Sequence, residues 1–207
     1  PLPAGARSWV GSPCSGHAGR VTGLSFSPDG KTLASAGSDG TIRVWDLSTG
    51  ERTLQISLPG DSVDLYDIEF SPDGAMLASA QQMVEVGWFS ISGMAADVRL
   101  WDSRTGDLLS VLQDGDGRPV HSGRLSFSRD GEVLATLSQT HAGRAVQLWD
   151  PKTKAKRLEI ERREPGMDLM FSAFALAPGG KSLVTTSSNE MVRWDLETKQ
   201  PLWKVMS

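Results

Sequence analysis

The sequence predicts an all-β fold in which one four-stranded antiparallel unit occurs four times along 207 residues. A repeated turn motif is the first reason: FSPDG at 26–30 recurs as FSPDG at 70–74, FSRDG at 127–131 and LAPGG at 176–180. A Trp-Asp pair after each motif is the second reason, at Trp45 and Asp46, Trp101 and Asp102, Trp149 and Asp150, and Trp194 and Asp195. The third is a composition with 22 Gly and 11 Pro, which suits many tight turns. Such self-similarity indicates a repeat architecture.

The first copy predicts four strands, at 21–26, 32–36, 41–46 and 52–58. Its segments VTGLSF and TIRVW alternate apolar positions and are rich in β-branched and aromatic residues, which is typical of half-buried strands. The sequence SPDG between the first two strands predicts a tight turn, because Pro presets φ, Asp bonds to the backbone ahead and Gly adopts positive φ. LSTGE after the third strand predicts the next turn in the same way.

The chain reads as a single domain of four repeats, at about 16–58, 60–113, 117–161 and 166–206. ARSWV at 6–10 is expected to be the last strand of a preceding repeat. KTKAKRLEIERR at 152–163 has helical propensity, but the repeat register places a turn and then a strand there, and we favour the strand. The fourth copy is one residue short in NEMVRWD, which predicts a register shift or bulge in its third strand.

A period near 45 residues, the Trp-Asp endings and Gly16-His17 before the first strand resemble the WD-repeat family of β-propellers, over residues 16–206. The resemblance implies four-stranded antiparallel blades and, in each blade, a buried hydrogen-bonded tetrad. Only the first copy has the whole tetrad, as His17, Ser35, Asp39 and Trp45. Such a network satisfies the indole and imidazole groups that the fold buries. The first copy is also similar to repeats of bacterial multidomain proteins.

Four copies predict four blades, whereas propellers contain about four to eight. The extra strand expected at 6–10 and the absence of an initiator Met favour an open arc of a larger ring, as a segment of a longer protein. A closed four-bladed ring and a dimer of two arcs making eight blades are the alternatives. An open arc exposes the apolar flanks of its end blades, because each repeat depends on its neighbours for burial, and self-association is therefore expected.

Several function classes are disfavoured by the sequence. A net charge of −4, from 21 basic and 25 acidic residues, lacks the positive field that nucleic-acid binding requires. No apolar run approaches the roughly 18 residues of a membrane span, and no signal sequence is visible, so we expect no membrane insertion and a cytoplasmic location. A single cysteine excludes an internal disulfide.

Catalytic and cofactor motifs find no match. Three His and one Cys show no metal-ligand spacing, and neither a Gly-rich phosphate loop nor a G-x-S-x-G elbow occurs. Cys14 and His17 are the one close pair that could form a nucleophile and base, but the resemblance assigns His17 to the tetrad. We predict a protein that is not an enzyme and binds neither a metal nor a cofactor.

Partner binding is expected on loops, which differ between the copies while the scaffold is shared. The resemblance implies that the loops between the second and third strands and between consecutive blades share the partner-binding face. Between Ser79 and Trp101 the chain has twelve more residues than between Ser35 and Trp45. Apolar members of this insert and polar members of the third copy's loops are the candidate contacts: Trp88, Phe89, Met94, Arg118, His121, His141 and Arg144. A longer hairpin that covers its own blade is the alternative for the insert.

The resulting prediction is a non-catalytic scaffold that binds a protein or peptide. A small-ligand or catalytic propeller with a central funnel is one alternative, and the acids available to it on first strands are Asp64, Asp67 and Glu69. A PD-type repeat propeller of the bacterial envelope is the other; it shares FSPDG, but the four Trp-Asp pairs argue against it.

Overall fold

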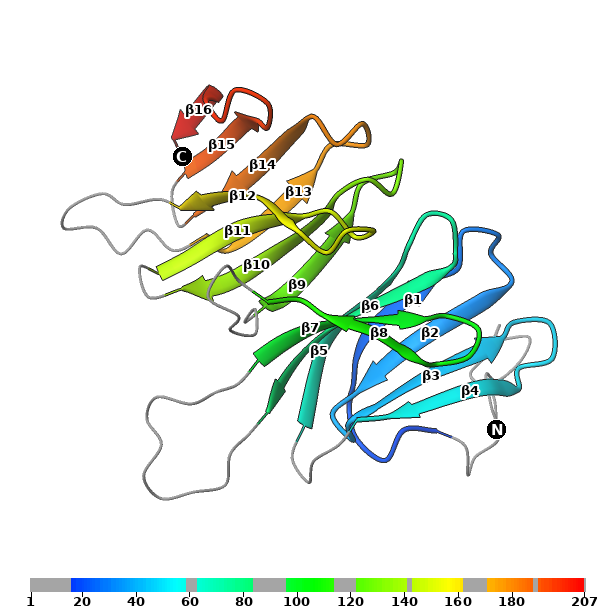
Figure 1. The fold of residues 1–207 in the computed structure, drawn as a ribbon. Coiled ribbons are helices and arrows are strands. Elements are labelled where there is room, and N and C mark those ends of the chain that lie inside the picture. Colours follow the sequence, from blue (N-terminus) through cyan, green and yellow to red (C-terminus); the bar gives the residue numbers. More distant parts are fainter. Residues whose placement is uncertain are drawn as a thin grey trace, which may run out of the picture.

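The computed structural model describes residues 16–58, 63–83, 96–113, 122–140, 143–161, 171–187 and 190–206. Every secondary-structure element in this part of the chain is a β-strand, and the strands form four sheets of four (Figure 1). This confirms the all-β prediction. No helix in the described residues is long and apolar enough to cross a membrane, and the cytoplasmic location stays a prediction.

Each sheet is one blade, built from consecutive strands. Blade 1 comprises β1 (Val21–Phe26), β2 (Thr32–Gly37), β3 (Thr41–Asp46) and β4 (Arg52–Ser57). Blade 2 comprises β5 (Val63–Phe70), β6 (Met76–Met83), β7 (Ala96–Asp102) and β8 (Leu108–Val111). Blade 3 comprises β9 (Ser122–Phe127), β10 (Leu134–Thr140), β11 (Gly143–Trp149) and β12 (Lys156–Glu161). Blade 4 comprises β13 (Ala173–Leu176), β14 (Ser182–Thr186), β15 (Glu190–Asp195) and β16 (Pro201–Met206).

Neighbouring strands within a blade are antiparallel and follow the chain order. The turns after the first and third strands of every blade therefore lie at one face, and the other connections lie at the opposite face, which we call the loop face. The first turn of each blade carries a glycine with φ between 63° and 73°, a conformation that side chains with a Cβ rarely adopt. These glycines are Gly30, Gly74, Gly131 and Gly180.

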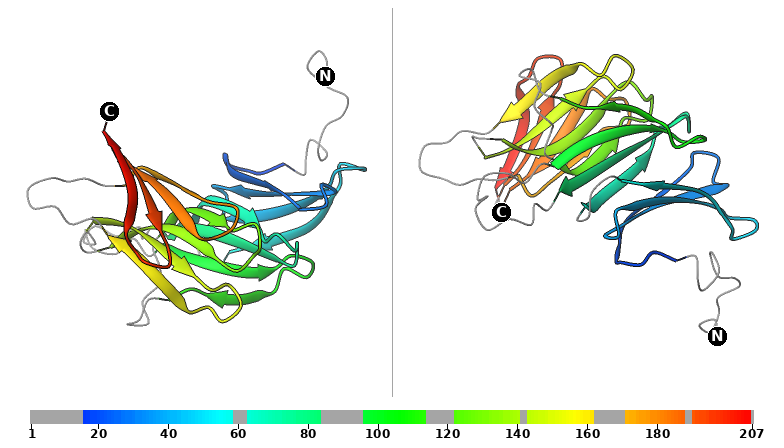
Figure 2. Two further views of the ribbon diagram at one scale, coloured as in Figure 1. Left: turned by 90° about the horizontal axis from the view of Figure 1, so that it is seen from above. Right: turned by 60° about the horizontal axis from the view of Figure 1, so that its bottom comes forward.

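The blades form an open arc. The inner strand β1 lies against β5, β5 against β9, and β9 against β13. The sheets fan out along this series, with blades 1 and 4 at opposite ends (Figure 2). The β-propeller blades predicted from the repeats are thus present, as four blades in an open arc.

Three apolar seams join the blades. In the first seam, Ala34, Ile42 and Val44 of blade 1 are buried together with Phe70 and Trp101 of blade 2. The second and third seams repeat this arrangement, because Leu134 and Trp149 pack on blade 2 and Leu183 packs on blade 3. A strand has two faces, so one face of each blade contacts the preceding blade and the other contacts the following blade. The Trp of each Trp-Asp pair in blades 2 to 4 faces the preceding blade.

Two local predictions were tested by the strand pairing. The segment around Lys156–Glu161 is a strand with Leu158 and Ile160 buried, as the repeat register predicts and against its helical propensity. The register shift predicted for the third strand of the fourth copy is present, between Arg193 and Trp194 in the pairing of β15 with β16, but the missing residue is not its cause. β14 and β15 pair without a shift, and the irregularity between β15 and β16 at Arg193 and Trp194 has a counterpart in every blade. The missing residue is absorbed by a shorter turn, in which the Ser187 N–H donates to the Glu190 carbonyl.

Candidate functional site

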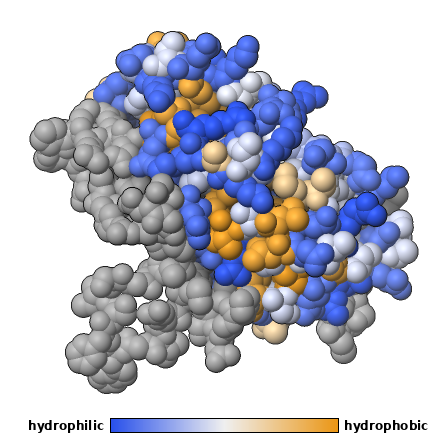
Figure 3. Space-filling model, in the orientation of Figure 1, coloured by the Kyte–Doolittle hydropathy of each residue, from blue (hydrophilic) through white to orange (hydrophobic). Residues whose placement is uncertain are grey.

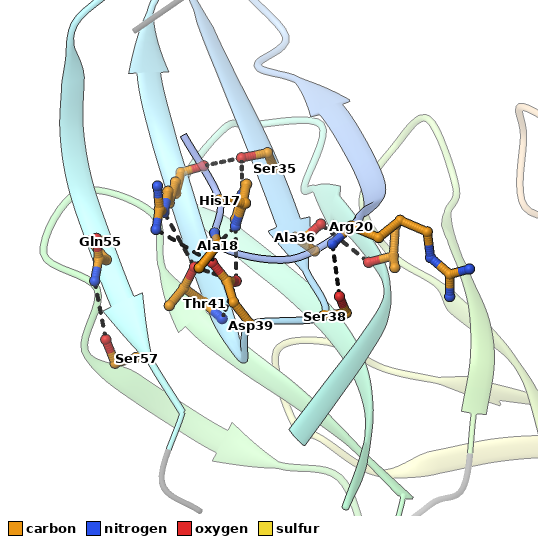
Figure 4. A network of polar contacts seen from close by, with 12 residues as sticks. His17, Ala18, Arg20, Ser35, Ala36, Ser38, Asp39, Thr41, Gln55 and Ser57 are labelled. Carbon is orange, nitrogen blue, oxygen red and sulfur yellow. Dashed lines mark hydrogen bonds and ion pairs between the residues drawn. The ribbon is translucent and has the colours of Figure 1, made fainter. Parts of the chain in front are cut away.

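The loop face of blade 1 contains a connected network of buried polar groups (Figure 4). The His17 ring is 2.8 Å from Ser35 Oγ through Nε2 and 2.9 Å from Asp39 Oδ1 through Nδ1. The Trp45 indole N–H donates to Ser35 Oγ at 2.9 Å. The structure therefore joins all four residues of the predicted tetrad. The network ties the segment entering β1 to the turn between β2 and β3.

Asp39 is the centre of charge in this network. Burial raises the pKa of Asp39, but hydrogen bonds from His17, the Thr41 hydroxyl and the Ala18 N–H outweigh it and bring the pKa to about 2. The Arg43 guanidinium lies 3.4 Å from the same carboxylate. Asp39 is therefore ionised at neutral pH and positions the loop in front of blade 1.

Gly37 is what makes room for His17. A Cβ at this position would lie 2.3 Å from His17 Nδ1 and 2.5 Å from Asp39 Oδ1. The strand pairing places Gln81 of blade 2 and Ser138 of blade 3 at the equivalent position, and both side chains are buried. A His in the blade 1 position would collide with these side chains. Blades 2 and 3 therefore lack the tetrad for two reasons: they have no His at the position of His17, and they have a larger residue at the position of Gly37.

One hydrogen bond of the tetrad persists in all four blades. The Trp indole N–H donates to a hydroxyl on the neighbouring second strand, at distances from 2.9 to 3.1 Å. Because a buried indole N–H without an acceptor is destabilising, this bond accounts for the Ser or Thr in each copy. The donor and acceptor pairs are Trp45 and Ser35, Trp101 and Ser79, Trp149 and Thr136, and Trp194 and Thr185.

Blades 2 and 4 carry buried acids that sequence comparison missed. Asp97 in blade 2 forms an ion pair with Arg99 at 3.0 Å, and Glu190 in blade 4 pairs with Lys204 at 3.1 Å. Counted back from the Trp, both acids stand where blade 1 has Thr41. The acid has moved from the turn onto the third strand. Alignment on the Trp, and not on the turn, is the signal that would have found them.

The Asp of each Trp-Asp pair closes the turn opposite the loop face. Its Oδ1 accepts the backbone N–H groups two and three residues ahead, as Asp46 does from Ser48 and Thr49 at 2.8 and 3.1 Å. Hydrogen bonds lower the pKa of all four aspartates, Asp46, Asp102, Asp150 and Asp195. For Asp46 the Ser48 hydroxyl contributes most, and for Asp102 and Asp195 the backbone N–H groups contribute most. For Asp150, the Arg157 guanidinium contributes most and the pKa falls to about 2. The four acids act as turn caps and stabilise the face opposite the loops.

The acids that a central funnel would use have another role. Asp67 Oδ2 accepts the Leu125 N–H at 3.0 Å, and Glu69 Oε2 accepts the Phe127 N–H at 2.9 Å. Both acids lie on β5 and both N–H donors lie on β9, so these two hydrogen bonds join the inner strands of blades 2 and 3. In the first seam, Ser25 Oγ accepts the Phe70 N–H at 3.0 Å in the same manner.

Burial raises the pKa of both seam acids. For Glu69 it outweighs the hydrogen bond from the Phe127 N–H and, together with the charge of Asp67, brings the pKa to about 7. For Asp67 burial also raises the pKa, against the Leu125 and Ile68 N–H groups and the charge of Arg124. The sequence named both residues as acids available to a funnel, but not their role as half-buried acceptors between two blades. In the described residues no group of three or more His, Cys, Asp or Glu could hold a metal ion.

The predicted partner-binding residues fall largely outside the described part of the chain. This holds for Trp88, Phe89, Met94, Arg118, His121 and His141. Arg144 lies in β11, with its backbone paired to Gln139, and its side chain is not described. The described strands nevertheless fix where these loops are attached: β6 ends at Met83 and β7 begins at Ala96, both at the loop face.

Connection length separates the two faces. At the turn face the connections are nearly uniform, running from 27–31 in blade 1 to 128–133 in blade 3. At the loop face the connection between second and third strands varies from 141–142 in blade 3 to 84–95 in blade 2. The large differences in connection length between the copies therefore lie at the loop face, and the turn-face connections differ by one residue at most.

The blades, the shared Trp-to-hydroxyl bond and the His17 network together define a repeat protein of the propeller class. Comparison with known proteins agrees: residues 10–46 match the family described as WD domain, G-beta repeat. The chain is 29% identical over 134 residues to Pre-mRNA-processing factor 19 homolog 2 of Arabidopsis thaliana, which covers 65% of this chain and 22% of that protein.

Two further relatives cover more of the chain. Periodic tryptophan protein 2 of Arabidopsis thaliana is 28% identical over 180 residues, covering 86% of this chain and 18% of the relative. Small ribosomal subunit protein RACK1 of Brassica napus is 26% identical over 147 residues, covering 67% and 41%. The chain thus spans less than half the length of each of these three proteins. All three are eukaryotic and give no support to the predicted bacterial character.

Proposed function

We propose that this chain is a non-catalytic scaffold that binds a protein or peptide through the loop face. The observation that carries the proposal is the confinement of large differences in connection length to that face, while the turn face is nearly uniform and its Asp side chains are used in turn caps. Binding sites commonly lie on variable loops held by a rigid scaffold. The resemblance to WD-repeat proteins supports the same class. The RACK1 relative is, by its name, a protein of the small ribosomal subunit, and so a component of a larger assembly.

The insert of blade 2 is the proposed centre of the binding site. It contains Trp88, Phe89 and Met94, and aromatic residues and Met are enriched at protein interfaces. Arg118, His121, His141 and Arg144 are proposed as polar contacts around it. The described strand acids Asp67 and Glu69 are engaged between blades, so they give the funnel alternative no support.

The test replaces residues 84–95 by the turn 38–40 of blade 1, because the short connection already joins equivalent strands there. Affinity capture with quantitative mass spectrometry compares the variant with the wild type. We expect the blade to fold, with a nearly unchanged melting temperature, and the specifically captured proteins to be lost. The double variant Trp88→Ser with Phe89→Ser should show the same loss.

The matched control alters the turn face, by Lys31→Ser in the turn of blade 1, whose side chain is exposed. Capture should be unaffected by this control. If the loop replacement lowers the melting temperature markedly, the insert packs on its own blade, and the alternative of a covering hairpin is correct. If capture persists in a folded loop variant, the loop face of blade 2 is not the binding site.

A further inference from the structure

The two ends of the arc expose side chains that the internal seams bury. We define flank 1 as Leu24 and Phe26 on β1, and flank 4 as Met191 and Arg193 on β15 with Trp203 and Val205 on β16. Leu24 and Phe26 are 61% and 64% exposed, whereas their counterparts in blade 2, Ile68 and Phe70, are 2% and 7% exposed. Each counterpart is identified by the same strand register, as Phe26 pairs with Leu33 and Phe70 with Leu77. Flank 1 is therefore one half of a seam without its other half.

Flank 4 corresponds to the other half of such a seam, the half that contacts the following blade. Val205 is 56% exposed, while Ile56 and Ile160 at the equivalent register are 7% and 6% exposed. In blades 1 and 3 this position contacts the following blade. Flank 1 is built to receive a preceding blade and flank 4 to receive a following one. The two flanks lie at opposite ends of the arc in Figure 2, too far round to meet within one chain.

The residue types of flank 4 suit an interface between chains. Where the internal seams have Ile42, Val44 and Leu54, flank 4 has Met191, Arg193 and Trp203. Met, Arg and Trp are the types enriched at protein–protein interfaces relative to other surfaces. The Arg193 guanidinium donates to Ser182 Oγ at 3.2 Å, so its position along the sheet is set. An arginine there can also stack on an aromatic ring such as that of Phe26.

We propose that flank 4 of one chain packs on flank 1 of a second copy, and that two copies close an eight-bladed ring. A head-to-tail contact closes into a ring when the rotation per subunit permits, and eight blades lie within the range of known propellers. The two seams of the ring are equivalent and repeat the packing of the three seams inside each chain. This association uses the arc's ends and is independent of partner binding at the loop face.

The experiment measures molar mass by light scattering and sedimentation over a wide range of concentrations. The wild type is expected at twice the chain mass of 22.3 kDa. Phe26→Asp places a charge in flank 1 and Val205→Asp places one in flank 4. Each should raise the dissociation constant of the dimer by at least about thirtyfold, as for a hot-spot residue. Because both side chains are exposed in the single chain, each variant should retain a cooperative melting transition.

Mixing the two variants is the decisive step. Phe26→Asp retains flank 4 and Val205→Asp retains flank 1, so the mixture should form a heterodimer through one intact seam. If either variant fails to fold, Leu24→Asp and Trp203→Ser replace them. Leu108→Asp is the matched control, because Leu108 is 48% exposed on the outer strand β8 and lies on neither flank. Figure 3 shows that apolar surface also occurs over the middle of the arc, away from its two ends.

Each other outcome overturns the proposal. A wild type that stays monomeric shows that another protein, or blades outside these residues, complete the flanks. A dimer that survives Val205→Asp but not Phe26→Asp shows flank 1 pairing with itself. A series of species larger than the dimer shows that the arcs do not close, and loss of the dimer in Leu108→Asp places the contact on blade 2.

Discussion

At the scale of single residues, the His17 network has two separable parts. The bond from the Trp indole to a hydroxyl is present in all four blades, so it belongs to the fold. The His17 and Asp39 part is present in blade 1, where Gly37 leaves room for the imidazole. Blade 1 has no preceding blade in the arc, so this network is what holds the segment entering β1 against the sheet.

Replacement of His17 by Ala should therefore destabilise the chain more than an average surface substitution. The change leaves Asp39 without its ring partner and opens space behind Gly37, with an expected loss of about 1–3 kcal/mol in the free energy of unfolding. Urea denaturation at neutral pH measures this loss. Lys31→Ala, on the exposed turn at the other face of blade 1, serves as the control and should change little. Equal stability of His17→Ala and wild type would show that the network does not stabilise blade 1.

At the scale of strands and turns, the sequence was most informative where a residue type has one structural use. The Pro, Asp and Gly of the turn motif predicted the first turn of each blade, and the alternating pattern of the first copy predicted β1 and β3 with their observed bounds. The register shift in the third strand of the fourth copy is present but was predicted for the wrong reason, because every blade has one there and the missing residue is absorbed by a turn. Contacts between blades were beyond reach, since the role of Glu69 depends on where β9 lies in space.

The seam between β5 and β9 should respond to pH through Glu69. Its folded-state pKa, about 7, is above its ordinary value of 4.5, so the folded state binds a proton more tightly than the unfolded state does. The stabilisation from this group is fully present below pH 4.5 and is lost as the pH rises through 7. Glu69→Gln keeps an oxygen that accepts the Phe127 N–H and removes the titration.

Relative to wild type, Glu69→Gln should thus gain stability between pH 5 and pH 8, by on the order of 2 kcal/mol. Chemical denaturation at both pH values measures the free energy of unfolding of each protein. In the difference between the two proteins, the contributions of titrating groups that both contain cancel. Glu51→Gln, at an exposed carboxyl in the turn of blade 1, is the control and should show no such pH-dependent gain. A difference that stays constant with pH would mean that Glu69 does not titrate in the seam.

At the scale of the whole molecule, stability should be graded along and across the arc. A stack of repeats is stabilised by its own strands and by contacts with its neighbours, so end blades have lost one of two contacts. Blades 2 and 3 are covered on both faces, and their second and third strands are buried at most of the described positions, with Met76, Arg99 and Asp102 half-buried. Every residue of β16 is exposed, and this strand pairs with β15 alone.

Amide hydrogen exchange, followed by mass spectrometry at low protein concentration, should reveal this gradient. We expect peptides from β6, β7, β10 and β11 to exchange most slowly and peptides from β16 to exchange fastest among the strands, because local opening needs less apolar surface to be exposed there. β4, also an outermost strand but with Ile56 buried in the first seam, is the internal comparison and should exchange more slowly than β16. Equal protection of β4 and β16 at low concentration would show that cooperative unfolding extends over the whole arc. Slowing of β1, β15 and β16 as the concentration rises is what a head-to-tail contact between flanks requires, since these strands carry the two flanks.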